Sequence, residues 1–483
     1  FNCESTIIRL CSNSNDFKSK PRFASKSYEV LELGGRNKHM RLDHKNIKLL
    51  SLLLVAILLL SGLIAYKIFY PSNKMVNPFD NGGNKRNMIV VLSDVHLGAD
   101  LNYAECKNNL GALEKLLKQI KEAKNIKELV IAGDLVDEWF VPATVDTYQG
   151  KNQTDFVQRI AQANKGVFDV INNIIQEGNI LVTYVPGNHD LTITATNIEN
   201  VFPGINQARD KTLGLGTYSP VDYPKIAVEH GHRYNFFCAP DPISNQKIAP
   251  GTILPPGYFF TRIAALHVIQ GRPLPGDTTP VISPNASGGE SQDLLYKYWK
   301  LWDMTVKLFP ITNKFNEDII VTNVNGFSGS NSVNDLIPYQ STPGGTVDVN
   351  LFKGIQDNWE ARQTLNNVSV HTMASRAIDL ANSATETDYQ AILQYFMIPD
   401  SNKRIVVFGH THEPKIVASK NYNNKKSLYA NSGTWIDHNQ NKTTMNFVVI
   451  TPQSNNIFSK TFVKLYNFQN EVVTKMAEDS LRY

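Results

Sequence analysis

The chain has 483 residues, of which 42% are hydrophobic and 19% are charged, a composition that is ordinary for a folded protein and excludes a wholly disordered one. The formal net charge is +4, but residues 1–48 carry ten Lys/Arg against five Asp/Glu, so residues 49–483 carry 38 against 39. The main body therefore has no large basic excess, and nucleic acid is not its expected partner. Four cysteines without a CxxC pair exclude a disulfide scaffold and a zinc ribbon.

The first organising signal along the chain is an uncharged hydrophobic run from Leu49 to Tyr66. Its 18 residues reach the length of a membrane-spanning helix and exceed the core of an ordinary signal peptide. We therefore expect residues 49–70 to form a transmembrane anchor, with a cleaved signal sequence as the alternative. More basic residues precede the run than follow it, which predicts a single-pass membrane protein with an extracytoplasmic catalytic domain, or a secreted or periplasmic one after cleavage.

The segments beside this run receive simpler predictions. Residues 1–48 are expected to be a basic, disordered segment, and translation starting at Met40 is one interpretation of the first 39 residues. Residues 71–87 are expected to be a linker.

From Met88 onward, short β-branched runs alternate with amphipathic stretches, which predicts an α/β architecture. Helices are expected at 104–123 and 156–176. The predicted strands cover residues 88–92, 128–132, 180–185, 225–230, 404–408 and 446–450. We expect one catalytic domain at 88–450, with 451–483 as a C-terminal extension of the same domain.

Residues 233–403 separate the fourth predicted strand from the fifth and are interpreted as an insertion. It holds a Pro/Gly-rich stretch at 239–258, a helix at 291–309, a loop-like region at 311–357 and further helical sequence. Because both its ends adjoin polar motifs, we expect a lid that sets substrate choice. Arg233 and Arg262 are the candidates for substrate binding, since a guanidinium can bind phosphate or carboxylate through paired N–H groups.

Five polar motifs follow the ends of predicted strands. They are Asp94-Val-His96, Gly133-Asp134, Gly187-Asn188-His189-Asp190, His230-Gly231-His232 and Gly409-His410-Thr411-His412. Open α/β sheets bind ligands beyond the carboxyl ends of their strands, so all five can meet in one crevice. Carboxylates, imidazoles and an amide oxygen suit two divalent cations such as Mn²⁺, Fe²⁺ or Zn²⁺. Such a pair clamps the attacking and departing oxygens of a displacement and lowers the pKa of bound water enough to supply hydroxide.

The five motifs, in this order, resemble the calcineurin-like metallophosphoesterase superfamily, whose signature is DxH, GD, GNHD/E, an isolated His and GHxH. The resemblance spans residues 88–232 and 404–450. It implies a four-layer α/β/β/α sandwich and a hydrolase that cleaves a phosphate ester or anhydride bond by a metal-bridging hydroxide. The ligands it implies are Asp94, His96 and His412 for one metal, Asn188, His230 and His410 for the other, and Asp134 bridging both.

The resemblance also implies catalytic roles within the GNHD motif. His189 occupies the position that contacts the phosphoryl group or protonates the leaving oxygen, and Asp190 is expected to orient its imidazole. A further metal ligand is the alternative role for His189.

The substrate is less constrained than the metal site. SDVHLG followed by GDLVDEW is similar to the UDP-diacylglucosamine pyrophosphatase branch, but that branch lacks a long insertion such as the 171 residues at 233–403. A phosphorylated small molecule, a nucleotide and a lipid all stay open as substrates, and the oligomeric state is open too. The alternative from another class is a catalytically silent interaction protein of the same fold, against which the complete ligand set argues.

Overall fold

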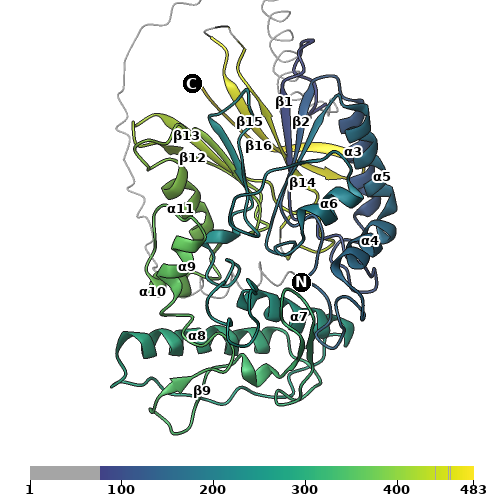
Figure 1. Ribbon diagram of the computed structural model, residues 1–483. Helices are drawn as coiled ribbons and strands as arrows, with labels where there is room; N and C mark the ends of the chain where they lie inside the picture. Colours follow the sequence, from purple (N-terminus) through teal and green to yellow (C-terminus); the bar gives the residue numbers. More distant parts are fainter. Residues whose placement is uncertain (1–76, 441, 455, 457) are drawn as a thin grey trace, which may run out of the picture. The chain divides into compact units, whose positions relative to one another are not determined.

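The computed structural model describes residues 77–440, 442–454, 456 and 458–483 (Figure 1). The predicted basic segment, the predicted membrane segment and the first part of the predicted linker lie outside the described residues. Within the described part of the chain, no helix combines the length and the apolar character needed to cross a membrane.

A seven-stranded mixed sheet forms around the first predicted strand. Its order is β16-β15-β14-β1-β2-β3-β4, with β1 parallel to β2 and antiparallel to β14. Its strands are β1 (Met88–Leu92), β2 (Ile126–Ala132), β3 (Leu181–Val185), β4 (Asn206–Gln207), β14 (Asn446–Thr451), β15 (Thr461–Gln469) and β16 (Val472–Leu481). The C-terminal residues thus supply two strands of the same sheet that β1 opens.

A second, five-stranded sheet has the order β12-β13-β11-β6-β5. Its strands are β5 (Thr217–Tyr218), β6 (Ile226–Glu229), β11 (Ile405–Phe408), β12 (Lys415–Lys420) and β13 (Lys426–Asn431). The strand before the insertion, β6, pairs in parallel with the strand after it, β11. The insertion therefore leaves and rejoins this sheet at neighbouring strands.

The two sheets pack face to face through buried aliphatic side chains, among them Val91, Val130, Val228 and Val407. Helices α3 (Leu110–Glu122), α4 (Gln153–Ala163) and α5 (Lys165–Glu177) belong to the core on the other face of the seven-stranded sheet. On the far face of the five-stranded sheet, α11 (Ala384–Tyr395) packs over Phe408 and Tyr429. Figure 1 shows these helices on opposite sides of the two sheets, which agrees with the predicted four-layer sandwich.

The insertion is more regular than its sequence indicates. Its further elements are α7 (Pro256–Ile269), α8 (Gly289–Leu308), β7 (Ile320–Thr322), β8 (Gly329–Asn331), β9 (Tyr339–Gln340), β10 (Val347–Asp348), α9 (Trp359–Leu365) and α10 (Ala374–Asp379). The loop-like region thus holds two small antiparallel pairs, β7 with β8 and β9 with β10. Helix α7 was not predicted because it begins in the Pro/Gly-rich stretch and is buried nearly all round, so its sequence has no amphipathic period.

The helix predicted at 156–176 is two helices, α4 and α5, which meet at Asn164. The buried side chain of Asn164 donates hydrogen bonds from Nδ2 to the carbonyl oxygens of Gly98, at 2.9 Å, and Ile160, at 2.8 Å. A side-chain amide that bonds the backbone in this way competes with the helical ladder and interrupts it. Asn164 also ties this break to Gly98, in the loop after the first polar motif.

We predict that Asn164→Ala lowers the free energy of unfolding by about 1–3 kcal/mol, because it leaves the buried Gly98 carbonyl without this donor. Chemical denaturation measures the change. Asn173→Ala, at an exposed position of α5, is the matched control and should stay within about 0.5 kcal/mol of the unaltered chain. Equal changes in the two variants would show that Asn164 contributes only through helix propensity.

Candidate metal centre

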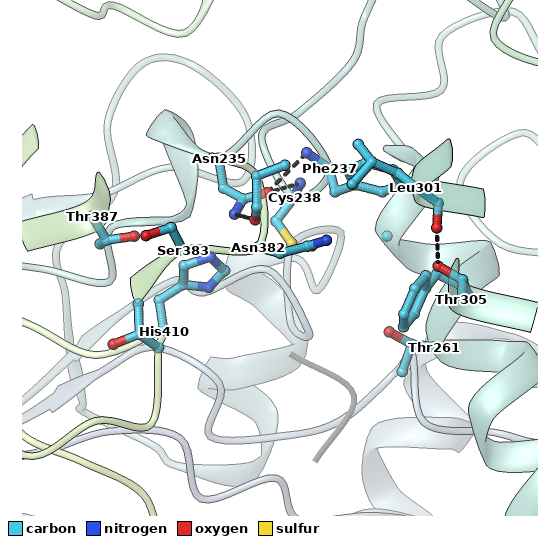
Figure 2. A pocket seen from close by; sticks show the side chains of 14 residues that line it. Asn235, Phe237, Cys238, Thr261, Leu301, Thr305, Asn382, Ser383, Thr387 and His410 are labelled. Atoms are coloured by element: carbon cyan, nitrogen blue, oxygen red, sulfur yellow. Dashed lines mark hydrogen bonds between the residues drawn. The ribbon is translucent and has the colours of Figure 1, made fainter. Parts of the chain in front are cut away.

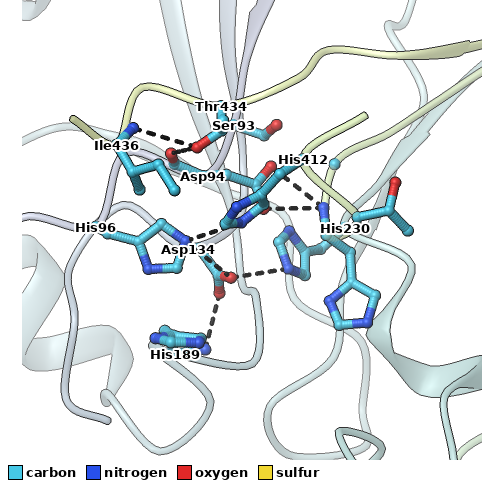
Figure 3. A network of polar contacts seen from close by, with 12 residues as sticks. Ser93, Asp94, His96, Asp134, His189, His230, His412, Thr434 and Ile436 are labelled. Atoms are coloured by element: carbon cyan, nitrogen blue, oxygen red, sulfur yellow. Dashed lines mark hydrogen bonds and ion pairs between the residues drawn. The ribbon is translucent and has the colours of Figure 1, made fainter. Parts of the chain in front are cut away.

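The seven predicted ligands lie in loops that directly follow strands. Asp94 and His96 follow β1, Asp134 follows β2, and the other four follow β3, β6 and β11: Asn188, His230, His410 and His412. Every one of the seven is at most 3% exposed. Figure 3 shows side chains from these loops pointing toward a common centre, so the structure brings together residues that lie more than 300 positions apart in sequence.

The backbone at this centre is strained. Five of the seven candidate ligands have positive φ angles, from 52° to 69°: Asp94, His96, Asp134, His410 and His412. This left-handed conformation costs a residue other than glycine about 1–3 kcal/mol and persists only where the surroundings fix it. Hydrogen bonds from the backbone N–H groups of Val95 and His96 to the carbonyl oxygen of Asp134, at 2.8 and 2.9 Å, fix two of these loops to each other. Such a concentration of strain is typical of a functional site.

Two glycines let the chain pass directly against the carboxylates. A Cβ atom at Gly187 would lie 2.1 Å from Oδ1 of Asp134, and one at Gly409 would lie 2.4 Å from Oδ2 of Asp94. No side chain fits at either position without displacing a carboxylate, so these glycines belong to the construction of the centre.

The first group of ligand atoms comes from Asp94, His96 and His412. Nε2 of His412 lies 3.0 Å from Oδ1 of Asp94 and 3.2 Å from Nε2 of His96. Atoms from the three side chains lie within 4.8 Å of one another, close enough to hold one metal ion.

The second group is centred on Asn188. Its Oδ1 lies 3.0 Å from Nε2 of His230 and 2.9 Å from Nδ1 of His410. Oδ2 of Asp134 lies 3.0 Å from Nε2 of His230 in this group and 3.7 Å from Nε2 of His96 in the first. The carboxylate of Asp134 therefore stands between the two groups, where a bridging ligand is expected.

These residues fit two divalent metal ions. Oδ2 of Asp134 is buried, lies 3.0 Å from Nε2 of His230 and accepts no hydrogen bond from the residues that the structure describes. The ring nitrogens of His96 and His412 point at each other. A buried carboxylate oxygen without a donor is costly, and a cation satisfies it. Two carboxylates, four imidazoles and one amide oxygen form a donor set that divalent metals prefer.

The electrostatics of the centre favour positive charge. Burial opposes protonation of His96, but Asp137 and Glu105 outweigh it and raise the pKa of His96 to about 9. Burial likewise opposes protonation of His230, while Asp134 and Asp94 raise its pKa to about 10. Because a metal ion binds neutral imidazole, we expect metal binding to displace these protons.

His189 is oriented by Asp137, a residue that the sequence analysis missed. Oδ1 of Asp137 lies 2.9 Å from Nδ1 of His189, and Oδ2 lies 3.0 Å from Nδ1 of His96. Asp137 is itself held by the backbone N–H groups of Trp139 and Phe140, at 2.9 and 2.7 Å. One carboxylate thus orients both a predicted metal ligand and the predicted catalytic histidine.

The prediction that Asp190 orients His189 is wrong. The carboxylate of Asp190 instead accepts hydrogen bonds from the backbone N–H groups of Gly187, at 2.5 Å, and Leu135, at 2.9 Å. It therefore joins the GNHD loop to the GD loop. Asp137 follows Asp134 by three residues in GDLVDEW, and this second carboxylate in the same loop was the available sequence signal.

Arg233 was predicted to bind substrate, and the structure corrects this. Its guanidinium is 4% exposed and donates from Nε to Oε1 of Glu229 and from Nη2 to Oδ2 of Asp210, both at 2.6 Å. A buried Glu229 needs a cationic partner, and Arg233 supplies it. The guanidinium is thus committed to the fold.

Arg262 is likewise a structural residue and not a substrate ligand. It is fully buried, and its guanidinium donates to the carbonyl oxygens of Val141, at 2.6 Å, and Val145, at 2.5 Å. A further bond of 3.1 Å reaches the carbonyl oxygen of Val321. Arg262 therefore fastens α7 to the loop that follows Asp137.

Comparison with known families agrees with this site. Residues 88–252 match the family model for calcineurin-like phosphoesterase. The match covers about a third of the chain and includes five of the seven candidate ligands: Asp94, His96, Asp134, Asn188 and His230. The matched segment ends before His410 and His412, and in the structure these two residues join the same centre from the far side of the insertion.

Solved structures and curated proteins were compared with the chain as well. Among solved structures, the chain is similar to the Pseudomonas putida nuclease MPE, with 16% sequence identity and a TM-score of 0.18. The similarity covers 29% of this chain and about half, 53%, of the nuclease chain. A search of curated proteins found no match.

We predict that Asp137→Asn weakens metal binding and the hydrolysis of a phosphate ester, each by about 10–100-fold, because a carboxamide cannot accept hydrogen bonds from both imidazoles. Titration of metal-free protein with Mn²⁺ or Zn²⁺ and steady-state hydrolysis of 4-nitrophenyl phosphate measure the two effects. Asp169→Asn, on the exposed face of α5, is the control and should change neither. Unchanged metal affinity and turnover in Asp137→Asn would contradict the positioning role.

Proposed function

We propose that this domain is a hydrolase that uses two divalent metal ions to cleave a phosphate ester or anhydride bond. The observation that carries the proposal is the place of Asp134, whose buried Oδ2 stands between two groups of ligand atoms. A carboxylate in that position can hold two cations close together. When bound, the two cations supply charge stabilisation for the phosphoryl oxygens and a nucleophile at neutral pH.

The protein contributes a rigid arrangement of ligands. Asp94, His96 and His412 would hold one cation, and Asn188, His230 and His410 would hold the other. These side chains are buried and come from loops that are hydrogen-bonded to one another, so they need little rearrangement to act. Preorganised charge of this kind is a large part of enzymatic rate enhancement.

His189 lies at the edge of this arrangement and is suited to donate a proton. Because its Nδ1 is hydrogen-bonded to Oδ1 of Asp137, its Nε2 is the atom that can donate to a phosphoryl or departing oxygen. The ring stacks on Trp139, with centroids 5.0 Å apart, which fixes the plane of the imidazole. The carboxylate of Asp137 stabilises the protonated imidazole, as the acid of such a pair requires.

The finer alternatives are less well supported. A pyrophosphatase of the UDP-diacylglucosamine type must accommodate a second phosphate, and the two guanidinium groups that were candidates for it, Arg233 and Arg262, are committed to internal partners. A catalytically silent protein has no need of a strained seven-ligand centre. An ester of a single phosphate is therefore the substrate class that we favour.

We predict that Asp134→Asn is the most damaging single ligand substitution, because loss of this carboxylate disturbs both groups at once. The decrease in kcat/KM should exceed about 100-fold, the upper end for a residue that acts through a metal ligand. Assays with added Mn²⁺, Fe²⁺ or Zn²⁺, together with metal analysis of the purified variant, measure it. Near-normal turnover with two metals bound would contradict the bridging assignment.

We predict that His189→Ala lowers kcat by about 10²–10⁴-fold and leaves metal content nearly unchanged. The loss should be smaller for nitrophenyl esters than for alkyl esters, because a good leaving group needs no proton. His371→Ala, at an exposed position of the insertion, is the matched control and should keep full activity. Metal loss in His189→Ala would make His189 a ligand instead.

A further inference from the structure

A pocket lies between the insertion and the metal centre (Figure 2). One side is formed by His410 and Thr411, from the loop that holds two of the predicted ligands. The opposite side comes from α7 and α8 of the insertion and includes Phe260 and Leu301. A group held in this pocket would therefore lie next to the atoms that act on a phosphate at the centre.

The lining of the pocket is uncharged apart from its histidine. None of the described residues that line it is Asp, Glu, Lys or Arg. The nearby arginines of the insertion, Arg233, Arg262 and Arg362, all donate to internal carboxylates or carbonyl oxygens. A second phosphate or a carboxylate in the pocket would lose its hydration without gaining a cationic partner, which is costly.

One polar group in the pocket lacks a partner. The side chain of Asn382 is 7% exposed, and its Nδ2 makes no hydrogen bond within the described part of the chain. Figure 2 shows its amide between His410 on one side and Thr305 and Leu301 on the other. A buried amide donor without an acceptor is costly, so its position indicates a ligand that supplies one. The hydroxyl-bearing Thr387, on α11, lines the same pocket.

We propose that this pocket binds the organic group of the substrate, and that this group is an uncharged, partly apolar alcohol with an oxygen that accepts a hydrogen bond from Nδ2 of Asn382. Phe237, Phe260 and Leu301 contact its apolar part. The proposal rests on the proposed function and narrows it to esters of one phosphate with a neutral alcohol. In the reaction, water adds to phosphorus, the ester P–O bond breaks, and the departing oxygen takes up a proton.

The test uses three diesters that share 4-nitrophenol as the leaving group, with the full chain and Mn²⁺. The three diesters differ in their second alcohol. It is methanol in the first, thymidine joined through its 5′ oxygen in the second, and thymidine 3′-phosphate joined through its 5′ oxygen in the third. We expect kcat/KM for the thymidine ester to exceed that for the methyl ester by about 10-fold, because thymidine supplies a ring and carbonyl acceptors. The 3′-phosphate should abolish this advantage, because the pocket offers no cation to it.

Two variants test the role of Asn382 and the wall beside it. Asn382→Ala should lower kcat/KM for the thymidine ester by about 5- to 10-fold and change the methyl ester less than 2-fold. Thr387→Val keeps the side-chain volume and removes the hydroxyl, and it should also lower kcat/KM for the thymidine ester more than for the methyl ester. It tests the pocket independently in case Asn382→Ala does not fold. Asn334→Ala, at an exposed position of the insertion, is the control and should change neither ratio.

The outcomes separate the two proposals. No hydrolysis of the three diesters, and none of 4-nitrophenyl phosphate, with metal present overturns the proposed function and this inference with it. Hydrolysis with equal rates for the thymidine and methyl esters, or equal losses on both in Asn382→Ala, overturns only the pocket inference. Faster hydrolysis of the ester that carries the 3′-phosphate also overturns it, because that result requires a cation in the pocket.

Discussion

The position of Asp134 is the constraint on which the rest of the site depends. Its Oδ1 accepts the backbone N–H of His189 at 2.8 Å, and its carbonyl oxygen accepts those of Val95 and His96. One residue thus aligns three loops and still leaves Oδ2 facing the ligand atoms of both groups. Because loops on a rigid scaffold carry function, these contacts convert the ends of separate strands into a single centre.

The left-handed backbone at this centre lowers the stability of the fold, and the packed sandwich offsets that loss. Five left-handed residues at about 1–3 kcal/mol each represent a cost comparable with the whole stability of an ordinary domain, about 5–15 kcal/mol. The two sheets bury continuous aliphatic faces against each other, and helices cover both outer faces. The strained residues stand directly after these buried strands, so the core fixes where each loop begins.

The convergence of the seven candidate ligands was predictable from sequence, because it depends on residue type and on position after a strand. Both properties are visible in motifs such as Gly409-His410-Thr411-His412. Asp137 was visible as a second carboxylate in GDLVDEW, but its partners were not predictable, and neither were the roles of Asp190 and Arg233. They depend on the direction of a side chain within a loop and on which buried groups surround it. Proximity in sequence favoured Asp190 as the partner of His189, whereas the loop geometry turns its carboxylate to the backbone of Gly187.

That the insertion acts as a lid that sets substrate choice stays a prediction, but its contacts show that it is held firmly in place. Its aromatic side chains, including Phe237 and Tyr258, belong to the same buried cluster as Trp139, which stacks on His189. Three buried arginines fasten it further, and Arg362 donates to the carbonyl oxygen of Ala239 at 2.6 Å. Because each anchoring guanidinium satisfies several buried acceptors, displacing the insertion would leave many polar groups unpaired. A pocket with walls built in this way is preformed, so the selectivity that we propose for it would come from shape, lack of charge and the amide of Asn382 rather than from closure.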